Sequence, residues 1–339
     1  MSFWEKLEKP FFVLAPMADV TDAAFRRLIA RESAHTRPDG TLGGPDVTWT
    51  EFVSADGLAR APEEGKKKLL ADLMYTEAER PIVAQLFSSV PEHMAYAAQL
   101  VAELGFDGID INMGCPDKSI EKQGCGAGMI KNPEKAVAVI EAALRGSAAS
   151  GRSIPVSVKT RVGYNKDEIE TWIPTLLATD ISALTIHART RKEMSLVPAR
   201  WERVARVVEL RDALGSRARI IGNGDALSLS DAREKAMQTG ADGVMLGRAI
   251  FGNPWLFHPE KDLSTVSLTE RFRVLVEHTY LFEELLPHKS FAIMKKHYKA
   301  YVHGFDGAKE LRMELMEAPD AKEVERITQN FLKAFSPLS

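Results

Sequence analysis

Cysteine is scarce in this chain, and long apolar runs and an excess of basic residues are absent. Two cysteines among 339 residues exclude a disulfide scaffold, and no cysteine and histidine cluster has the spacing of a zinc site. No apolar stretch approaches the roughly 20 residues that a membrane-spanning helix needs, and the charged start of the chain does not resemble a secretory signal peptide. We therefore expect a cytoplasmic protein without metal or membrane contacts, and we take it to be a monomer.

The charge balance restricts how nucleic acid could be bound. Lys and Arg number 44 and Asp and Glu number 47, for a net charge of −3. This balance excludes a uniformly basic surface, so an RNA partner would need a local basic patch. Hydrophobic residues make up 45% of the chain and charged residues 27%, as is usual for a globular protein.

Short apolar, β-branched runs alternate with helical stretches over the first three quarters of the chain. Strands are expected at 12–15, 47–52, 82–87, 108–112, 156–160, 184–187, 219–222 and 243–246, with loops at 33–45 and 61–68. Helices are expected at 21–31, 91–104, 133–145, 167–178, 201–214 and 230–239. This alternation predicts an α/β protein with a (β/α)8 TIM barrel. A doubly wound open sheet is the alternative, disfavoured because no G-x-G-x-x-G motif follows an early strand.

The pattern changes after about residue 262. Strand signals end, and amphipathic stretches predict helices at 269–286, 290–302, 308–316 and 321–335. We therefore expect two domains, a catalytic barrel over 1–261 and a C-terminal all-α helical bundle over 262–339.

The segment 108–116, with the sequence Gly-Ile-Asp-Ile-Asn-Met-Gly-Cys-Pro, is the most informative part of the chain. A short strand ends at Asn112, breaks at Gly114 and presents the thiol of Cys115 before a proline. The carboxyl end of a barrel strand and the loop after it are where this fold places its chemistry. Cys115 is therefore a candidate proton donor or nucleophile, the alternative being a buried cysteine that acts as a small hydrophobic group.

Polar side chains close other expected strands. Lys159 ends the fifth strand, where a lysine is either a Schiff-base nucleophile or a fixed positive charge beside an anionic ligand. Arg161 lies two residues further on the same side of that strand. Gln85 offers an amide suited to the edge of a heterocycle, and His187 either binds a ligand or closes a packed layer.

Glycine-rich turns follow the last two strands, at Gly222, Gly224 and Gly247. Glycines let backbone N–H groups approach a phosphate closely, and this end of the barrel is where the fold commonly binds one. The alternative is that these glycines only form tight turns. Taken together, the strand ends fit a phosphorylated flavin across the barrel mouth, with Lys159 stabilising the negative charge of the reduced ring.

The ordered segments 15–22, 110–116, 158–163, 185–191, 222–225 and 245–249 resemble those of tRNA-dihydrouridine synthases, and the likeness runs from about residue 11 to 257. The resemblance implies an FMN-dependent barrel oxidoreductase with a C-terminal helical domain that helps to hold tRNA. It also implies reduction of the C5–C6 double bond of particular uridines to 5,6-dihydrouridine, with NADPH or NADH as electron donor.

The resemblance implies roles for individual residues. Contacts with FMN are expected at Pro16, Met17, Ala18, Gln85, Lys159, His187, Asn223, Gly224, Asp225, Gly247 and Arg248. Cys115 is the expected general acid, which donates a proton to C5 of the uracil after hydride transfer from flavin N5 to C6. Contacts with the substrate are expected at Asn112, Arg161, Arg189, Arg191, Lys295, Lys296 and Lys299.

The expected RNA surface rests on a helical stretch that interleaves basic and aromatic side chains. Tyr298 and Tyr301 lie among its lysines, and Lys289 precedes them, a pattern that suits phosphate contact and base stacking. The alternative is an ordinary solvated helix face. The chain departs from the family at Cys125, which we interpret as a tolerated substitution, and at 197–201, where RNA contacts are expected to differ.

Three other functions stay open at this point. An FMN barrel could act on a free pyrimidine or a dihydroorotate-like molecule, and the acidic balance favours this slightly. A phosphate-binding aldolase or isomerase could use Lys159 as its Schiff base. The chain could also be an RNA-binding protein without catalytic activity.

Overall fold

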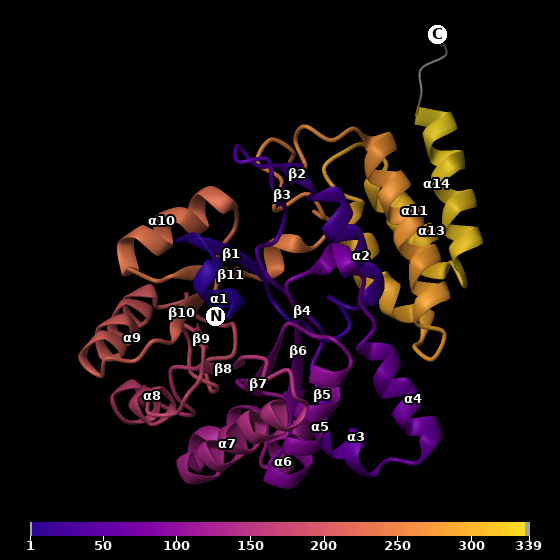
Figure 1. Cartoon of the computed structure of the whole chain (residues 1–339). Helices are drawn as coiled ribbons and strands as arrows, with labels where there is room; N and C mark the ends of the chain where they lie inside the picture. The colour runs from indigo at the N-terminus through magenta and orange to yellow at the C-terminus, as the bar shows by residue number, and fades with distance from the viewer. Residues whose placement is uncertain (1, 336–339) are drawn as a thin grey trace.

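The computed structural model describes residues 2–335, and parallel strands form a barrel at its centre (Figure 1). The strand order is β1-β11-β10-β9-β8-β7-β6-β4, and β5 also pairs with β6. The bounds of these strands are β1 Phe11–Leu14, β4 Thr48–Trp49, β5 Val53–Ser54, β6 Ile82–Phe87, β7 Gly108–Met113, β8 Val156–Arg161, β9 Ala183–His187, β10 Arg219–Asn223 and β11 Gly243–Leu246.

Backbone hydrogen bonds close the ring between β1 and the chain that leads into β4. The N–H of Leu14 donates to the carbonyl of Val47 at 3.1 Å, and the N–H of Asp46 donates to that of Phe12 at 2.8 Å. Because the first and last members of the strand order are joined, the sheet is a barrel. The expected TIM barrel is confirmed, and the open-sheet alternative is wrong.

One expected strand, 47–52, is divided into β4 and β5. The N–H of Thr50 donates to the carbonyl of Val83 at 3.0 Å, as in a regular ladder. The next acceptor is a side chain, because the N–H of Gln85 donates to Oγ1 of Thr50 at 3.1 Å. A side-chain oxygen in place of a carbonyl interrupts the pairing after Thr50, and it resumes where Val53 of β5 pairs with Leu86.

Most crossover helices begin and end near the predicted positions. They are α2 Ala23–Glu32, α5 Pro91–Glu103, α7 Pro133–Ala149, α8 Ile169–Leu177, α9 Trp201–Ala213 and α10 Leu229–Thr239. Side-chain oxygens of Asp22, Asn132 and Ser228 accept backbone N–H groups at the starts of α2, α7 and α10. Gly240, with φ of +72°, ends α10 in the left-handed conformation that glycine adopts readily.

The expected loop at 61–68 is wrong, because α4 Glu63–Asp72 occupies most of it, directly after α3 Ala55–Arg60. No residue of α4 is buried, so its sequence carries no apolar stripe from which a helix could be read. The loop at 33–45 contains a short antiparallel pair, β2 His35–Thr36 and β3 Leu42–Gly43. Short helical elements complete the barrel, namely α1 Phe3–Lys6, α6 Lys118–Lys122, η1 Glu77–Glu79, η2 Gly126–Lys131 and η3 Arg248–Ile250.

The C-terminal part is helical, as expected. Its elements are α11 Leu268–Leu285, η4 Phe291–Met294, α12 Lys295–Tyr301, α13 Ala308–Glu317 and α14 Ala321–Phe335. They stand beside α2 (Figure 1), and buried residues of both parts, including Phe25, Phe272 and Tyr301, form one hydrophobic cluster. The division into domains at residue 262 stays a prediction, and the last four residues of the second domain, 336–339, lie outside the described part.

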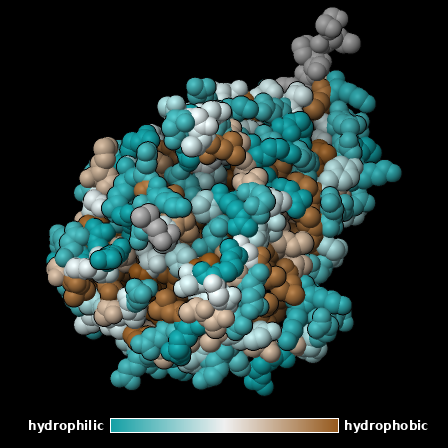
Figure 2. Space-filling view, viewed as in Figure 1, coloured by the Kyte–Doolittle hydropathy of each residue, from teal (hydrophilic) through white to brown (hydrophobic). Residues whose placement is uncertain are grey.

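The face seen in Figure 2 is mostly hydrophilic, with apolar groups in scattered patches. Among the described helices, none combines the length and the apolarity that crossing a bilayer requires.

A buried arginine ties α2 to η1. The side chains of Arg26 and Glu79 are almost fully buried, and Nε of Arg26 lies 2.8 Å from Oε2 of Glu79. Nη1 of Arg26 also donates to the carbonyl of Thr21 at 2.9 Å. A guanidinium enclosed in this way leaves an uncompensated carboxylate if it is removed.

We predict that Arg26→Met lowers the free energy of unfolding by about 3–5 kcal/mol, because Glu79 stays buried without its partner. Denaturant unfolding monitored by circular dichroism measures this. Arg27→Met is the matched control, since Arg27 is the adjacent residue of α2 and is less buried. Equal stability of the two variants would contradict the prediction.

Candidate active site

The parallel register brings the predicted polar residues to one rim of the barrel. Asn112 of β7 pairs with Lys159 of β8, and His187 of β9 pairs with Asn223 of β10. Nζ of Lys159 lies 3.3 Å from Oδ1 of Asn223, and Nδ2 of Asn223 donates to the carbonyl of Met245 at 2.8 Å. Residues from five consecutive barrel strands therefore form one contiguous polar surface.

A chain of hydrogen bonds joins the barrel interior to the Cys115 loop. Nε2 of Gln85 donates to Oδ2 of Asp110 at 2.7 Å, and Nδ2 of Asn112 donates to Oε1 of Gln85 at 3.0 Å. Oδ1 of Asn112 then accepts the N–H groups of Gly114 and Cys115, at 3.1 and 2.9 Å. Because a carboxylate only accepts, Asp110 fixes the orientation of both amides along the chain.

Asp110 was not identified from the sequence as a site residue. It is fully buried, and Oγ of Ser157 donates to its Oδ1 at 2.6 Å. Burial raises its pKa to about 6, against the hydrogen bonds from Ser157 and Gln85. One feature of the sequence could have identified it, namely a carboxylate between Ile109 and Ile111 in an otherwise apolar strand. A buried charge requires polar partners, so this carboxylate indicates a polar cluster inside the barrel.

The thiol of Cys115 is partly exposed at the rim. Burial raises its pKa above the ordinary value, so the thiol keeps its proton at neutral pH. Its loop is held from two further sides, because Nε of Arg161 donates to the carbonyl of Gly114 at 2.8 Å and the N–H of Ala127 donates to that of Cys115 at 2.9 Å. Cys125 is fully buried, and burial raises its pKa to about 11.

Positive charge is concentrated at the rim. Burial, and then the charge of Arg161, lower the pKa of Lys159 to about 8, with Asp110 opposing the shift. Burial lowers the pKa of Arg161 to about 10. Burial, then the charges of Arg161 and Lys159, hold the pKa of His187 well below its usual value, so its imidazole is neutral. Such a surface attracts an anionic ligand.

A cavity of about 370 Å³ lies between the loops that follow β10 and β11. Gly224 has φ of +130°, and a Cβ there would lie 2.8 Å from Cβ of Ala199, so only glycine fits. A Cβ at Gly247 would lie 3.5 Å from Sδ of Met17, which places the loop after β1 against the same region. The cavity is lined by Gly224, Asp225, Ala226, Leu227, Met245, Gly247, Arg248 and Ala249.

Three arginines predicted to touch substrate are paired with protein groups. Arg161 donates to the carbonyls of Thr190 and Met194 as well as to Gly114. Arg189 is buried and paired with Asp225, which also pairs with Arg248 at 2.5 Å. Arg191 pairs with Glu121. Their contacts with substrate stay predictions.

The lysines predicted to bind RNA lie on α12 at the edge of the rim. Lys295, Lys296 and Lys299 are exposed, and Nζ of Lys296 lies 3.7 Å from Oδ2 of Asp19 in the loop after β1. The two tyrosines do not share this surface. Tyr298 and Tyr301 are fully buried, so the expected base stacking on them is wrong, because their rings pack into the core instead.

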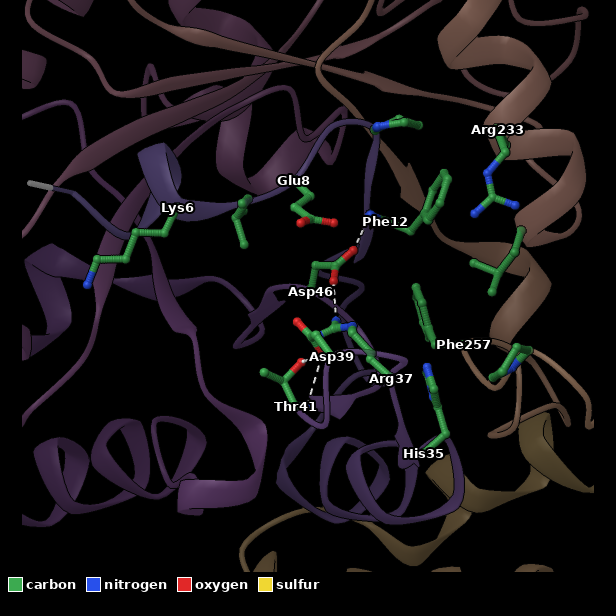
Figure 3. A pocket seen from close by; sticks show the side chains of 15 residues that line it. Lys6, Glu8, Phe12, His35, Arg37, Asp39, Thr41, Asp46, Arg233 and Phe257 are labelled. Atoms are coloured by element: carbon green, nitrogen blue, oxygen red, sulfur yellow. Dashed lines mark hydrogen bonds and ion pairs between the residues drawn. The ribbon is translucent and has the colours of Figure 1, made fainter.

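A second cavity, of about 490 Å³, lies beside the amino-terminal end of β1, away from the rim (Figure 3). Two of its charged groups pair with each other, since Arg37 and Asp46 lie 2.5 Å apart, and Asp46 also accepts the N–H of Phe12 at 2.7 Å. The guanidinium of Arg233 lies over the ring of Phe12, 5.4 Å from its centroid. This cavity takes no part in the candidate site.

The closed parallel barrel gathers its polar side chains at the carboxyl end of the strands, which is where (β/α)8-barrel proteins place their active sites. The chain belongs to the dihydrouridine synthase family, because the family model described as "Dihydrouridine synthase (Dus)" matches residues 13–336. The relatives named tRNA-dihydrouridine synthases make this a family of oxidoreductases, so the aldolase and non-catalytic interpretations are wrong.

Relatives cover nearly the whole chain. "Probable tRNA-dihydrouridine synthase 2" of Bacillus subtilis (strain 168) is 38% identical over 338 residues, 98% of each chain. "Probable tRNA-dihydrouridine synthase" of Staphylococcus epidermidis (strain RP62A) is 38% identical over 97% of this chain and 96% of that protein. Among solved structures, histamine dehydrogenase from Rhizobium sp. 4-9 is similar in fold, with a TM-score of 0.50 and 13% identity over 80% of this chain and 49% of that one.

We predict that Asp110→Ala makes Cys115 react about tenfold faster with iodoacetamide. The variant leaves Gln85 and Ser157 without their acceptor, and a lost hydrogen bond of about 1.4 kcal/mol loosens the loop by that factor. Mass spectrometry follows the alkylation in a Cys125→Ser background. Asp110→Asn is the control, because its carbonyl still accepts from Gln85. Equal alkylation rates for the proteins with Asp, Ala and Asn at position 110 would contradict the role of this hydrogen-bond chain.

Proposed function

We propose that this protein binds FMN at the barrel rim and, with NADPH or NADH as electron donor, reduces particular uridines of tRNA to 5,6-dihydrouridine. The observation that carries the proposal is the position of the Cys115 thiol, which is partly exposed in a loop held by Asn112 and Arg161 beside a basic, amide-lined cleft. Family membership and the names of the relatives support the substrate class.

The residues at the rim fit FMN. The cavity between Gly224 and Gly247 offers backbone amides and the guanidinium of Arg248 to a phosphate dianion. Lys159 and the neutral imidazole of His187 would hold the flavin ring, and Gln85 has one N–H left to donate to it. The net positive charge of the cleft suits both the phosphate and the anionic reduced ring.

FMN held by these residues would supply, in its reduced form, the hydride for C6 of the uracil. Cys115 then donates its proton to C5 from the opposite side as general acid, a contribution of typically 10²–10⁴ in rate. Its raised pKa keeps that proton available at neutral pH. Oδ1 of Asn112 accepts from the Cys115 loop, and one of its two amide N–H groups donates to Gln85. The second N–H is therefore free to donate to a uracil carbonyl.

The substrate uridine would have to leave its stack to reach this cleft. A local basic strip for the tRNA backbone is provided on α12 by Lys295, Lys296 and Lys299. A chain with a net charge of −3 needs such a local patch to bind RNA. The other interpretation, a free pyrimidine as substrate, gives this strip no role.

We predict that Arg248→Ala weakens FMN binding by about 10- to 100-fold, because a charged hydrogen bond contributes about 1.5–3 kcal/mol. Riboflavin lacks the phosphate, so its affinity should stay unchanged. Fluorescence titration of flavin-free protein measures both. Arg233→Ala, at the cavity of Figure 3, is the control and should bind both flavins as the wild type does. Equal losses for FMN and riboflavin would place the phosphate elsewhere.

We predict that Cys115→Ala lowers the rate of uridine reduction in tRNA by about 10²–10⁴ through loss of the proton donor. Reduction of the bound flavin by NADPH should be unaffected, since that step does not use the thiol. Stopped-flow absorbance and counting of dihydrouridine in tRNA separate the two steps. Cys125→Ala should keep full activity. Undiminished turnover by Cys115→Ala would reject the assignment.

A further inference from the structure

A buried ion cluster joins the C-terminal helices to the barrel. Lys289 lies between α11 and η4, and its Nζ is 2.6 Å from Oε2 of Glu51 and 3.1 Å from Oδ1 of Asp72. Its side chain is 13% exposed and that of Glu51 is 8% exposed. One ammonium therefore connects the tail to the interrupted strand at 50–52 and to the end of α4.

The second oxygen of Glu51 continues the link into the loop after β1. Oε1 of Glu51 accepts the backbone N–H of Asp19, a residue with φ of +53°. A non-glycine residue in this left-handed region is strained and persists only when its surroundings hold it. The same loop contains Met17, whose Sδ lies in the region of Gly247.

The charges make Lys289 indispensable to this arrangement. Although burial opposes its charge, Glu51 and Asp72 raise the pKa of Lys289 above its ordinary value. Asp22, the N-cap of α2, is buried nearby, and burial followed by the charge of Glu51 raises its pKa to about 7. Without Lys289, the buried carboxylate of Glu51 would lose its ammonium partner, which is strongly unfavourable. Asp72 is more exposed and would keep His288, whose Nε2 lies 3.2 Å from its Oδ1.

We propose that Lys289 is a positioning residue through which the helical tail, by way of Glu51, holds the loop 16–21 in the conformation that borders the flavin cleft. The proposal rests on the proposed function for the assignment of this loop to the flavin. In this proposal the helical tail has a second role besides RNA contact. Lys289 then differs in function from the exposed lysines of α12, which are the ones expected to bind RNA. Its effect reaches the cleft through Asp19 rather than through contact with a ligand.

The test compares Lys289→Met with Lys295→Met in the full-length protein, since Lys295 is exposed on α12. Hydrogen–deuterium exchange of the peptide 16–22, with no flavin present, reports on the loop directly. We expect Lys289→Met to speed exchange of the Asp19 amide about tenfold or more, as a lost buried hydrogen bond implies. Lys295→Met should exchange as the wild type does. Unchanged exchange in both variants would overturn the proposal.

Flavin titration gives the second readout. Lys289→Met should bind FMN and riboflavin more weakly by the same factor, because the loop borders the ring rather than the phosphate. Adding Glu51→Gln should restore only part of the affinity, since the amide still accepts from Asp19 and no uncompensated charge remains, but the ion pair to the tail is still missing. A Lys289→Met protein that keeps its flavin affinity but loses tRNA affinity would show an RNA contact instead.

Two further outcomes distinguish failure of the proposed role of Lys289 from failure of the proposed flavin binding. If wild-type protein takes up no flavin, the proposed function fails while the exchange experiment still decides the role of Lys289. If Lys289→Met does not fold, Glu51→Gln replaces it as the single variant. It weakens the ion pair and keeps the acceptor, so it should speed exchange at 16–22 by a smaller factor, and unchanged exchange would overturn the link.

Discussion

The hydrogen-bonded closure of the parallel barrel is the constraint on which the site depends. The bonds from Leu14 to Val47 and from Asp46 to Phe12 join β1 to the start of β4 and complete the ring. A closed parallel barrel places the carboxyl end of every strand on one rim. Residues as distant in sequence as Gln85 and Asn223 therefore share one cleft, and the chemistry of the protein follows from which side chains stand there.

Buried charge is the second organising feature. Asp110 lies beneath the rim, orients the two amides above it and offsets part of the positive charge of Lys159. Asp225 pairs with Arg189 and Arg248 beside the glycine-lined cavity and offsets part of their positive charge. Hydrogen bonds from Gln85 and Ser157 hold the buried Asp110, and ion pairs hold the partly exposed Asp225. The cleft keeps a positive surplus, which a phosphorylated, anionic ligand can neutralise.

Much of the fold could be predicted because the signals were local. Strands at 82–87 and 243–246 agree with the structure to the residue, since their apolar runs end abruptly at turns. The helix α4 could not be predicted, because it has no buried face. The division at Thr50 could not be predicted either, since it depends on a hydroxyl that meets Gln85 across two strands.

The site shows the same division between local and long-range information. Cys115, Lys159 and the glycine turns stand at strand ends, where the barrel pattern alone directs attention. The pairing of Glu51 with Lys289 spans 238 positions, and no spacing rule connects residues so far apart. The burial of Tyr298 and Tyr301 likewise follows from how the tail packs on α2, which the pattern of α12 does not reveal.

The most direct measurement supplies the purified, flavin-loaded protein and NADPH with tRNA that lacks dihydrouridine, and in parallel with free uridine and with orotate. Cofactor oxidation and nucleoside analysis are read together. We expect oxidation coupled to dihydrouridine formation with tRNA alone. Turnover of a free pyrimidine with the tRNA left unmodified would contradict it.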